Sequence, residues 1–352
     1  MSDVSGSVAS LRRSPAARSV IGGVRRLSNL GGQLRASVRR GVTVIYYHRI
    51  VDSPRDPWQL SVSPANFAEH VEVLAASGRP VLSFGGMVEA LRNDRLPPRA
   101  VAVTFDDGYA DNALTAVPLL EQAGVPATFF VVVDAVDAER ELWWDELERI
   151  FLAEPDLPPE LDLVVAGERV TATIGGEPPV DPSWRNHEAT DSVRAGLFVR
   201  VWRLLLTVGV DERDITMDAL AEWSGRPRTA RPERRLMTAS ELRAMVASPA
   251  AEVGSHTIRH PNLTLPNDRE REVVGSRAAL AEMIGRPVTT FAYPNGYHDA
   301  AAVDAVDRAG YRGACTTDAG VVTPAESPFK VPRYGAPNVG GDAFERFVRA
   351  LG

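Results

Sequence analysis

Seven short apolar runs, separated by segments with helical spacing, constrain this chain more than any other feature. Several runs are apolar on both faces and rich in β-branched or aromatic residues, which is typical of strands buried in a parallel sheet. They lie at 42–48, 101–107, 127–133, 252–257, 290–294, 313–317 and 330–334. Strands that alternate with helices predict an α/β fold, either a β/α barrel or an open doubly wound sheet.

Six segments between these runs have the apolar spacing of amphipathic helices. They lie at 63–77, 84–92, 112–123, 239–247, 268–284 and 299–309. The alternation stops after the third strand, where a predicted hairpin (161–165 and 169–174) and an amphipathic helix near 193–206 intervene. We therefore expect a main domain at 41–133 and 239–352, with an inserted α+β subdomain at 134–238. Trp143 and Trp144 in the insertion are either platforms for a sugar or, as is commoner for tryptophan, part of a hydrophobic core.

Residues 1–40 differ in charge from the rest of the chain. They contain eight arginines and one aspartate, a charge of about +7, whereas the whole chain has a net charge of −7. The apolar residues in this segment recur at helical spacing: Val20, Val24, Leu27, Leu30, Leu34 and Val38. This pattern predicts a basic amphipathic helix that docks on an anionic membrane surface, packs on the main domain or stays disordered.

Several classes of protein are disfavoured by the sequence. No apolar run is long enough for a transmembrane helix, and residues 1–40 lack the apolar stretch of a secretory signal. We therefore expect a cytoplasmic protein, able to lie peripherally on the inner face of the membrane. The single cysteine, Cys315, excludes a disulfide framework and a thiolate metal cluster. The remaining residues carry a charge of about −14, which argues against nucleic acid as a partner.

Two adjacent carboxylates follow the second predicted strand, in the segment TFDDGYADN. At the C-terminal end of a barrel strand, Asp106 and Asp107 would face the region where active sites form. Gly108 permits an unusual backbone there, so that both carboxylates can reach one cavity. The alternative is an ordinary turn that ends the strand.

Two histidines four residues apart follow the fourth predicted strand, in the segment HTIRHPN. This spacing would place His256 and His260 on one face of a helical turn, which Pro261 ends; the alternative is two unrelated surface histidines. A carboxylate and two imidazoles form the ligand set of a catalytic zinc site with an open position. The second carboxylate would then be left for proton transfer, so the pattern predicts metal-assisted hydrolysis.

The segments TFDDGYADN, SHTIRHPNL and FAYPNG resemble the successive motifs of the polysaccharide deacetylases, family 4 of the carbohydrate esterases, with the NodB-homology domain. The resemblance covers about residues 42–133 and 236–337. It implies a distorted (β/α)₇ barrel of parallel strands that hydrolyses an N-acetyl group from an amino sugar. It also implies one divalent metal ion, most often Zn²⁺, with Co²⁺, Ni²⁺ or Fe²⁺ as alternatives.

The resemblance assigns roles by motif position. The metal ligands would be Asp107, His256 and His260. Asp106 would be the general base that activates the metal-bound water. The backbone N–H of Tyr109 would donate to the oxyanion of the reacting amide.

The third motif departs from the family pattern. The arginine that usually precedes its proline and pairs with the base is replaced by Ala292 and Tyr293. Arg333, in the run VPRY, is the best substitute to orient Asp106; otherwise it is a surface or capping arginine. The residues implied to line the acetate pocket are Tyr293, Pro294 and Asn295.

The late histidine that protonates the leaving amine in this family has no counterpart, since no histidine follows His298. The first strand instead ends in YYHRI, with His48 at its tip, and poly-N-acetylglucosamine deacetylases carry a histidine in a similar early strand. We predict His48 as the general acid, because an imidazole titrates near neutral pH. His48 could instead cap the strand, and His298 is the weaker alternative; His70 and His187 are expected at the surface or in a helix.

These observations predict a metal-dependent N-deacetylase that acts on an amino-sugar residue of a polysaccharide, oligosaccharide or glycolipid precursor. A deformylase or a cyclic-imide amidohydrolase on the same fold is an alternative, and the reaction products would distinguish it. A barrel that binds carbohydrate without catalysis is a second alternative, which the metal content would test.

Overall fold

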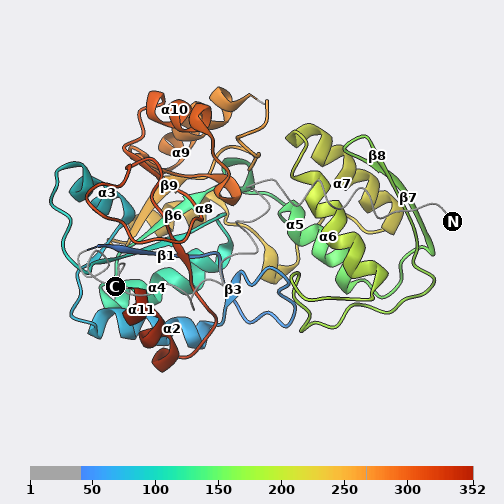
Figure 1. Ribbon diagram of the computed structural model, residues 1–352, viewed down its shortest axis with the longest axis horizontal. Helices are drawn as coiled ribbons and strands as arrows, with labels where there is room; N and C mark the ends of the chain where they lie inside the picture. Colours follow the sequence, from blue (N-terminus) through green and yellow to red (C-terminus); the bar gives the residue numbers. More distant parts are fainter. Residues whose placement is uncertain (1–40, 267, 352) are drawn as a thin grey trace.

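The computed structural model describes residues 41–266 and 268–351. Figure 1 shows a larger lobe with the central sheet and a smaller lobe of helices and a hairpin. The predicted helix within residues 1–40 lies outside the described residues. Among the described helices, none has both the length and the apolar character needed to cross a membrane.

Seven parallel strands form the central sheet within the described residues. They are β1 (Thr43–Tyr47), β5 (Val101–Phe105), β6 (Ala127–Val131), β9 (Ala251–Ser255), β10 (Thr290–Ala292), β11 (Gly313–Cys315) and β12 (Tyr334–Gly335). Their spatial order is β11-β10-β9-β6-β5-β1-β12, and all adjacent pairs are parallel. A parallel bridge between Cys315 and Val331 joins β11 to the segment before β12, which closes the ring. The predicted distorted (β/α)₇ barrel is confirmed.

Shorter strands accompany the barrel. β4 (Val81–Leu82) pairs with β5, and β2 (Arg49–Ile50) pairs with β3 (Ser61–Val62). The last barrel strand is shorter and lies later than the predicted run at 330–334. Pro332 lacks an amide hydrogen and cannot donate to a strand ladder, so the regular strand begins only after it.

Helices cover the outside of the barrel, where all six predicted segments are present. They are α2 (Pro64–Ala76), α3 (Phe84–Arg92), α4 (Val117–Ala123), α8 (Ala239–Ala247), α9 (Ser276–Ile284) and α10 (Ala300–Arg308). Side chains of Ser63, Ser83 and Thr238 cap the first turns of α2, α3 and α8, which explains where these helices begin. α4 and α9 are each extended at the N-terminal end by a π-helical turn, Asn112–Ala116 and Arg271–Gly275 respectively. We did not predict α11 (Gly341–Leu351), which packs on α2 through Phe344.

The barrel strands bury both faces, as their apolar composition predicts. Ile45 and Phe129 point outwards into the core beneath the helices. Val44 and Phe130 belong to a second core inside the barrel, which α3 closes at one end. Successive side chains of a strand point to opposite faces. Only inward-facing residues at the C-terminal ends of the strands can therefore meet at the end of this inner core.

The smaller lobe contains α5 (Trp143–Glu148), α6 (Val193–Leu205), α7 (Val210–Ser224) and the hairpin of β7 (Glu160–Val165) and β8 (Glu168–Thr173). Its hydrophobic core runs from Trp143 to Leu220 and is separate from the barrel cores. Trp143 and Trp144 are only 5% and 6% exposed, so both are core residues rather than free sugar platforms. The boundaries 134–238 for this insertion remain our proposal.

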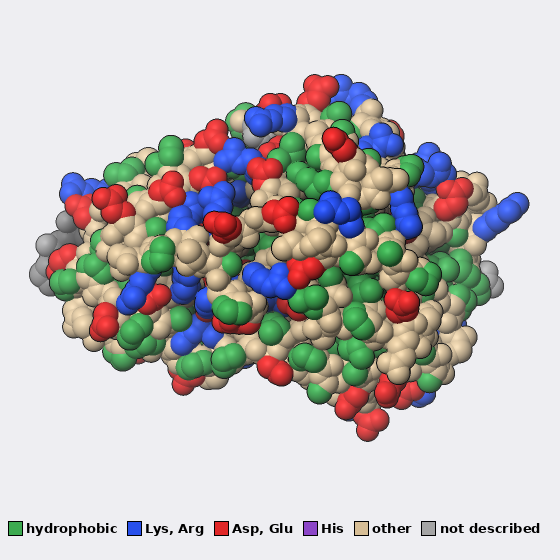
Figure 2. All heavy atoms as spheres, turned by 180° about the vertical axis from the view of Figure 1, so that it is seen from behind, with side chains coloured by type: hydrophobic (Ala, Val, Ile, Leu, Met, Phe, Trp, Pro, Cys, Tyr) green, Lys and Arg blue, Asp and Glu red, His purple; other side chains and the backbone are tan. Residues whose placement is uncertain are grey.

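Ion pairs join the two lobes. Arg49 of β2 pairs with Asp145 of α5, and Arg259, which follows β9, pairs with Asp214 of α7. Figure 2 shows basic and acidic side chains interspersed on the face seen from behind, without one large patch of a single sign. The surface charge on this face is therefore locally balanced.

Candidate functional site

The backbone after β5 is built to present two carboxylates. Asp107 and Gly108 have φ angles of 78° and 90°, in the region that favours glycine. A Cβ atom at Gly108 would lie 3.2 Å from Cγ1 of Val131, which leaves little space for any other residue. For Asp107 such a conformation costs on the order of 1–3 kcal/mol, and strain of this kind clusters at functional sites. Asp106 and Asp107 are both buried.

The two histidines converge by a different route from the one predicted. Residues 256–262 form no helical turn, so that expectation is wrong. Thr257 and His260 have φ angles of 71° and 55°, and the His260 N–H donates to Oγ1 of Thr257 at 3.0 Å. This tight bend after β9 brings the ring centroids of His256 and His260 to 4.8 Å.

Asp107, His256 and His260 form a possible metal site. Oδ1 of Asp107 lies 3.6 Å from Nε2 of His256 and 3.7 Å from Nε2 of His260. Tetrahedral bonds of about 2.0–2.1 Å separate two ligand atoms by about 3.4 Å, so a zinc-sized ion fits with a small contraction. Nδ1 of His256 donates to the carbonyl of Ala292 at 2.8 Å, which leaves Nε2 as the ligand atom.

The charges around Asp107 also fit a cation. Burial raises the pKa of Asp107 well above its usual range, and the negative charges of Asp106 and Asp145 raise it further. A bound divalent cation would reverse this effect, because its charge favours the ionised carboxylate. The donor set and its electrostatics therefore both fit a divalent metal ion.

Arg333 holds Asp106 in a bidentate ion pair. Its two Nη atoms each lie 2.8 Å from an oxygen of Asp106, and its Nε donates to the carbonyl of Thr316. Burial alone would raise the pKa of Asp106, but the charge and hydrogen bonds of Arg333 outweigh it and lower that pKa to about 2. The structure thus places Arg333 where the prediction requires it, although its role remains a proposal.

His48 lies close to these groups. Its imidazole interacts electrostatically with Asp106 and His256, and it is partly accessible, while its backbone carbonyl accepts a hydrogen bond from Asn112 at 2.8 Å. Burial lowers the pKa of His48 to about 4, against the opposing effect of Asp106. The resting imidazole is therefore neutral at pH 7.

The other histidines lie elsewhere. Nδ1 of His298 bonds the carbonyl of Gly296, and its ring packs on Tyr293. His187 is exposed in the smaller lobe. His70 is in α2 as expected but fully buried rather than at the surface. Of these alternatives, none belongs to the group around Asp106.

Tyr109 connects this site to the smaller lobe. Its hydroxyl donates to Oδ2 of Asp145 at 2.6 Å and accepts from Nε1 of Trp144 at 3.0 Å. No residue in the described part accepts a hydrogen bond from the Tyr109 N–H. The predicted oxyanion role of this N–H is therefore not opposed by a hydrogen bond to another described residue.

The expectation for Tyr293 needs correction. Its side chain is fully buried in the outer core, and its hydroxyl donates to the carbonyl of Phe329 at 3.1 Å. Ala292 points inwards at the preceding position, so strand alternation turns Tyr293 away from the site. Pro294 is buried, and Asn295 is partly exposed with a φ of 54°. Among the described residues, neither of the two is hydrogen-bonded to the side chains of the possible metal site.

Three residues of the insertion touch the site, and the sequence predicted this contact for none of them. The ring of Trp144, which we considered only as a sugar platform or a core residue, lies 4.7 Å from the His260 ring, and Asp145 bonds Tyr109. Arg213 of α7 donates to the carbonyl of His260. All three belong to the insertion, outside the motifs, so no local pattern indicated their positions.

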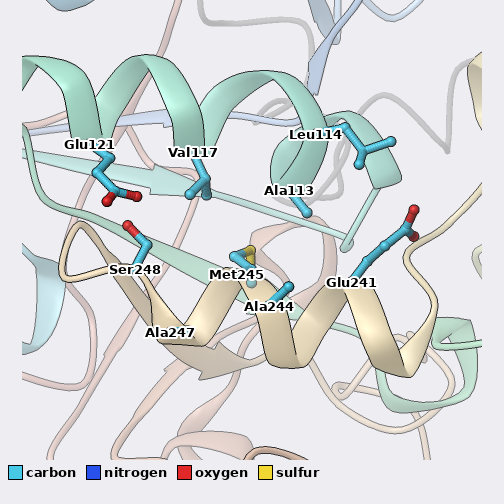
Figure 3. A pocket seen from close by; sticks show the side chains of 9 residues that line it. All are labelled: Ala113, Leu114, Val117, Glu121, Glu241, Ala244, Met245, Ala247 and Ser248. Atoms are coloured by element: carbon cyan, nitrogen blue, oxygen red, sulfur yellow. The ribbon is translucent and has the colours of Figure 1, made fainter.

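A separate cavity of about 330 Å³ lies on the outside of the barrel between α4 and α8 (Figure 3). Residues such as Val117 and Met245 line it, and none of the candidate site residues does. This cavity is therefore distinct from the site formed by the two aspartates and the two histidines.

Parts of this chain are similar to known proteins. A family model described as polysaccharide deacetylase matches residues 93–154 and 216–314. The YxkH protein of Bacillus subtilis (strain 168) is 28% identical over 108 residues, which cover 30% of this chain and 37% of that protein. The poly-β-1,6-N-acetyl-D-glucosamine N-deacetylase of Escherichia coli (strain K12) is 32% identical over 98 residues, 28% of this chain and 15% of that protein. The matches thus span well under two thirds of these relatives.

A solved structure supports the fold. The Streptococcus pyogenes deacetylase PplD, determined in complex with acetate, superposes with a TM-score of 0.56 at 16% identity. The superposition covers 89% of this chain and 98% of that one. The superposition shows that the fold is shared, and the family model matches segments in both halves of the barrel.

Proposed function

We propose that this chain is a metal-dependent hydrolase that removes an N-acetyl group from an amino-sugar residue of a polysaccharide, oligosaccharide or glycolipid precursor. The observation that carries the proposal is the buried pair of Asp106 and Arg333 beside a possible metal site, at the C-terminal end of the strands in a deacetylase-type barrel. This arrangement combines an ionised base with a place for a Lewis acid.

Asp107, His256 and His260 would hold one divalent ion, for which Zn²⁺ is our first choice and Co²⁺, Ni²⁺ and Fe²⁺ are alternatives. Such an ion acts as a Lewis acid, polarising an amide carbonyl and making water more acidic. His256 is already oriented for this role by its bond to Ala292.

Asp106 would accept the proton of the attacking water. Arg333 keeps this carboxylate ionised throughout the neutral range and fixes its orientation through two hydrogen bonds. A carboxylate with so low a pKa is a weak base. It could deprotonate water only if the divalent ion lowers the pKa of that water. Arg333 itself stays a positioning residue, since it bonds Asp106 with both Nη atoms.

His48 would donate a proton to the leaving amine when the carbon–nitrogen bond breaks. Its resting imidazole is neutral and partly accessible, so it must first take up a proton from the solvent, while Asp106 keeps the proton of the attacking water. The negative charge that develops on the reacting amide, together with nearby Asp106, favours the protonated imidazole. The Tyr109 N–H would donate to the developing oxyanion.

An oligomer of N-acetylglucosamine is the first substrate to test, because the E. coli relative is named for such a polymer. Purified protein would be loaded with Zn²⁺, and release of acetate, formate and ring-opened product would be measured separately. We expect acetate release that a chelator abolishes. Formate or ring-opened product without acetate would contradict the proposed acyl group.

The variant Asp106→Asn tests the mechanism. It should retain bound metal and lose nearly all acetate release, because the base is not one of the three proposed ligands. His256→Ala and His260→Ala should lose both metal and activity while the protein stays folded. Full activity in Asp106→Asn would refute the assignment of the base.

We also propose that residues 1–40, outside the described residues, dock on an anionic membrane surface at the cytoplasmic face. Basic residues near such a surface contribute about 1 kcal/mol each, so a net charge of about +7 can hold a peripheral protein. Deleting residues 1–38 should abolish binding to anionic liposomes at low salt and leave turnover of a soluble oligosaccharide unchanged. Equal liposome binding by both forms would reject this proposal.

A further inference from the structure

Arg213 is an unusual residue of the inserted lobe, because its guanidinium is buried without a carboxylate partner. It lies in the first turn of α7 and is 8% exposed. Within the described residues, no carboxylate oxygen lies within 4.0 Å of it. A buried charge without a counterion is costly unless hydrogen bonds satisfy it, so the partners of this side chain indicate its role.

Those partners are two consecutive carbonyls of the histidine motif. Nη1 of Arg213 donates to the carbonyl of His260 at 2.8 Å, and Nη2 donates to that of Arg259 at 2.6 Å. The Trp143 ring lies 5.5 Å from the guanidinium carbon and limits its movement. The planar guanidinium thus fixes the position of two adjacent peptide groups at once.

The segment that Arg213 holds would not keep its shape unaided. Thr257 and His260 both have left-handed backbone conformations, which persist only where the surroundings impose them. The insertion supplies further contacts to the same segment. Leu206 accepts a hydrogen bond from Asn262 at 3.1 Å, and the Trp144 ring packs against His260. α5, which carries Trp144, lies on the side of the smaller lobe that faces the barrel (Figure 1).

We propose that Arg213 is a positioning residue, which holds the His260 backbone so that Nε2 meets the divalent ion. The inserted lobe would therefore set the metal affinity of a site whose ligands all belong to the barrel. This inference rests on the proposed metal-dependent function. It explains why a guanidinium is buried here: a hydrocarbon side chain would leave both carbonyls without these donors.

Zinc affinity of the full-length protein, measured without substrate, tests the inference. Apo protein would be titrated with Zn²⁺ in competition with a chromophoric chelator. Arg213→Met should weaken zinc binding by about 10- to 100-fold, the usual effect of losing a group that orients a metal ligand. Arg213→Lys, which keeps the charge but not the planar fork, should fall between this variant and the wild type.

Arg194 provides a matched control. It is also fully buried in the inserted lobe and donates to backbone carbonyls, those of Phe151, Glu154 and Glu177, away from the metal motif. Arg194→Met should lower the thermal stability of the protein yet leave the zinc dissociation constant within about twofold, because no bond to His260 is lost. The visible spectrum of the Co²⁺-substituted protein should change in Arg213→Met and not in Arg194→Met.

Three outcomes would overturn the inference. Zinc affinity and a Co²⁺ spectrum unchanged in Arg213→Met would show that the arginine only stabilises the lobe. Equal weakening by Arg194→Met would show a general effect of unfolding the insertion. Should Arg213→Met not fold, unchanged zinc binding by Arg213→Lys would decide against the proposal. Failure of the wild type itself to bind a divalent ion would instead refute the proposed function on which it rests.

Discussion

Acid should destabilise this protein through one buried histidine, His70. Its Nε2 bonds the carbonyl of Val339 at 2.7 Å and must be the donor, so Nδ1 accepts from the Tyr47 hydroxyl at 3.2 Å. Its ring stacks on Phe344 with a centroid distance of 3.7 Å. Both ring nitrogens are thus occupied in the neutral form, and burial lowers the pKa of His70 from 6.5 to about 4.

The sign and size of the effect follow from this shift. As pH falls below 6.5 the unfolded chain binds a proton that the folded state does not, so folding stability falls until pH reaches about 4. At 1.36 kcal/mol per pKa unit, the loss from this residue is about 1.4 kcal/mol at pH 5.5 and about 3 kcal/mol at pH 4. Above neutral pH the contribution is complete and constant.

The variant His70→Gln isolates this contribution, because glutamine can make similar hydrogen bonds but does not titrate. Urea unfolding followed by tryptophan fluorescence would give the free energy of unfolding of both proteins at several pH values. The difference in free energy of unfolding between the two proteins should be constant from pH 7.5 to 9. By pH 4 the wild type should have lost about 3 kcal/mol relative to the variant. A difference that stays within about 0.5 kcal/mol over the whole range would refute the reasoning, since the buried imidazole would then titrate as in the unfolded chain.

Two further predictions concern the candidate site. His48→Ala should lower kcat by about 10²- to 10⁴-fold, and by less for substrates with better leaving groups; if His298→Ala shows this pattern and His48→Ala does not, the general acid is misassigned. Arg333→Met should lower the free energy of unfolding by about 3–5 kcal/mol, because it leaves the Asp106 charge buried and unpaired. In an Asp106→Leu background the same substitution should cost much less, and an equal loss in both backgrounds, measured by urea unfolding, would show that the ion pair is not the cause.

The parts of the fold that could be predicted are those whose signal is local. Strands buried on both faces leave continuous apolar runs, and the runs that contain Val103 and Phe129 matched the observed strands closely. The final strand was displaced because Pro332, visible in the sequence, interrupts the hydrogen-bond ladder. The segment Gly341–Leu351 has apolar residues at helical spacing, so this helix was also predictable from the sequence.

The site was predictable where its residues are neighbours in a motif. Asp106 and Asp107 are adjacent, and His256 and His260 are four residues apart, so their types and spacing indicated the chemistry. Tyr293 was misplaced although strand alternation, with Ala292 facing inwards, could have shown that it points outwards. Arg213 could not be found at all, because only the folded chain brings it to a carbonyl 47 positions away.

The closure of the barrel has a consequence for when the site can exist during synthesis. The segment that joins β11 to β1 carries Arg333. The Arg333 guanidinium bonds Thr104 of β5 and Asp106, which follows β5. A nascent chain that has not yet released this segment from the ribosome holds both aspartates and both histidines, but its ring is open and its base has no counterion. Ring closure and maturation of the base are therefore one event, and catalytic competence should arise only after the growing chain has folded its last barrel strand into place.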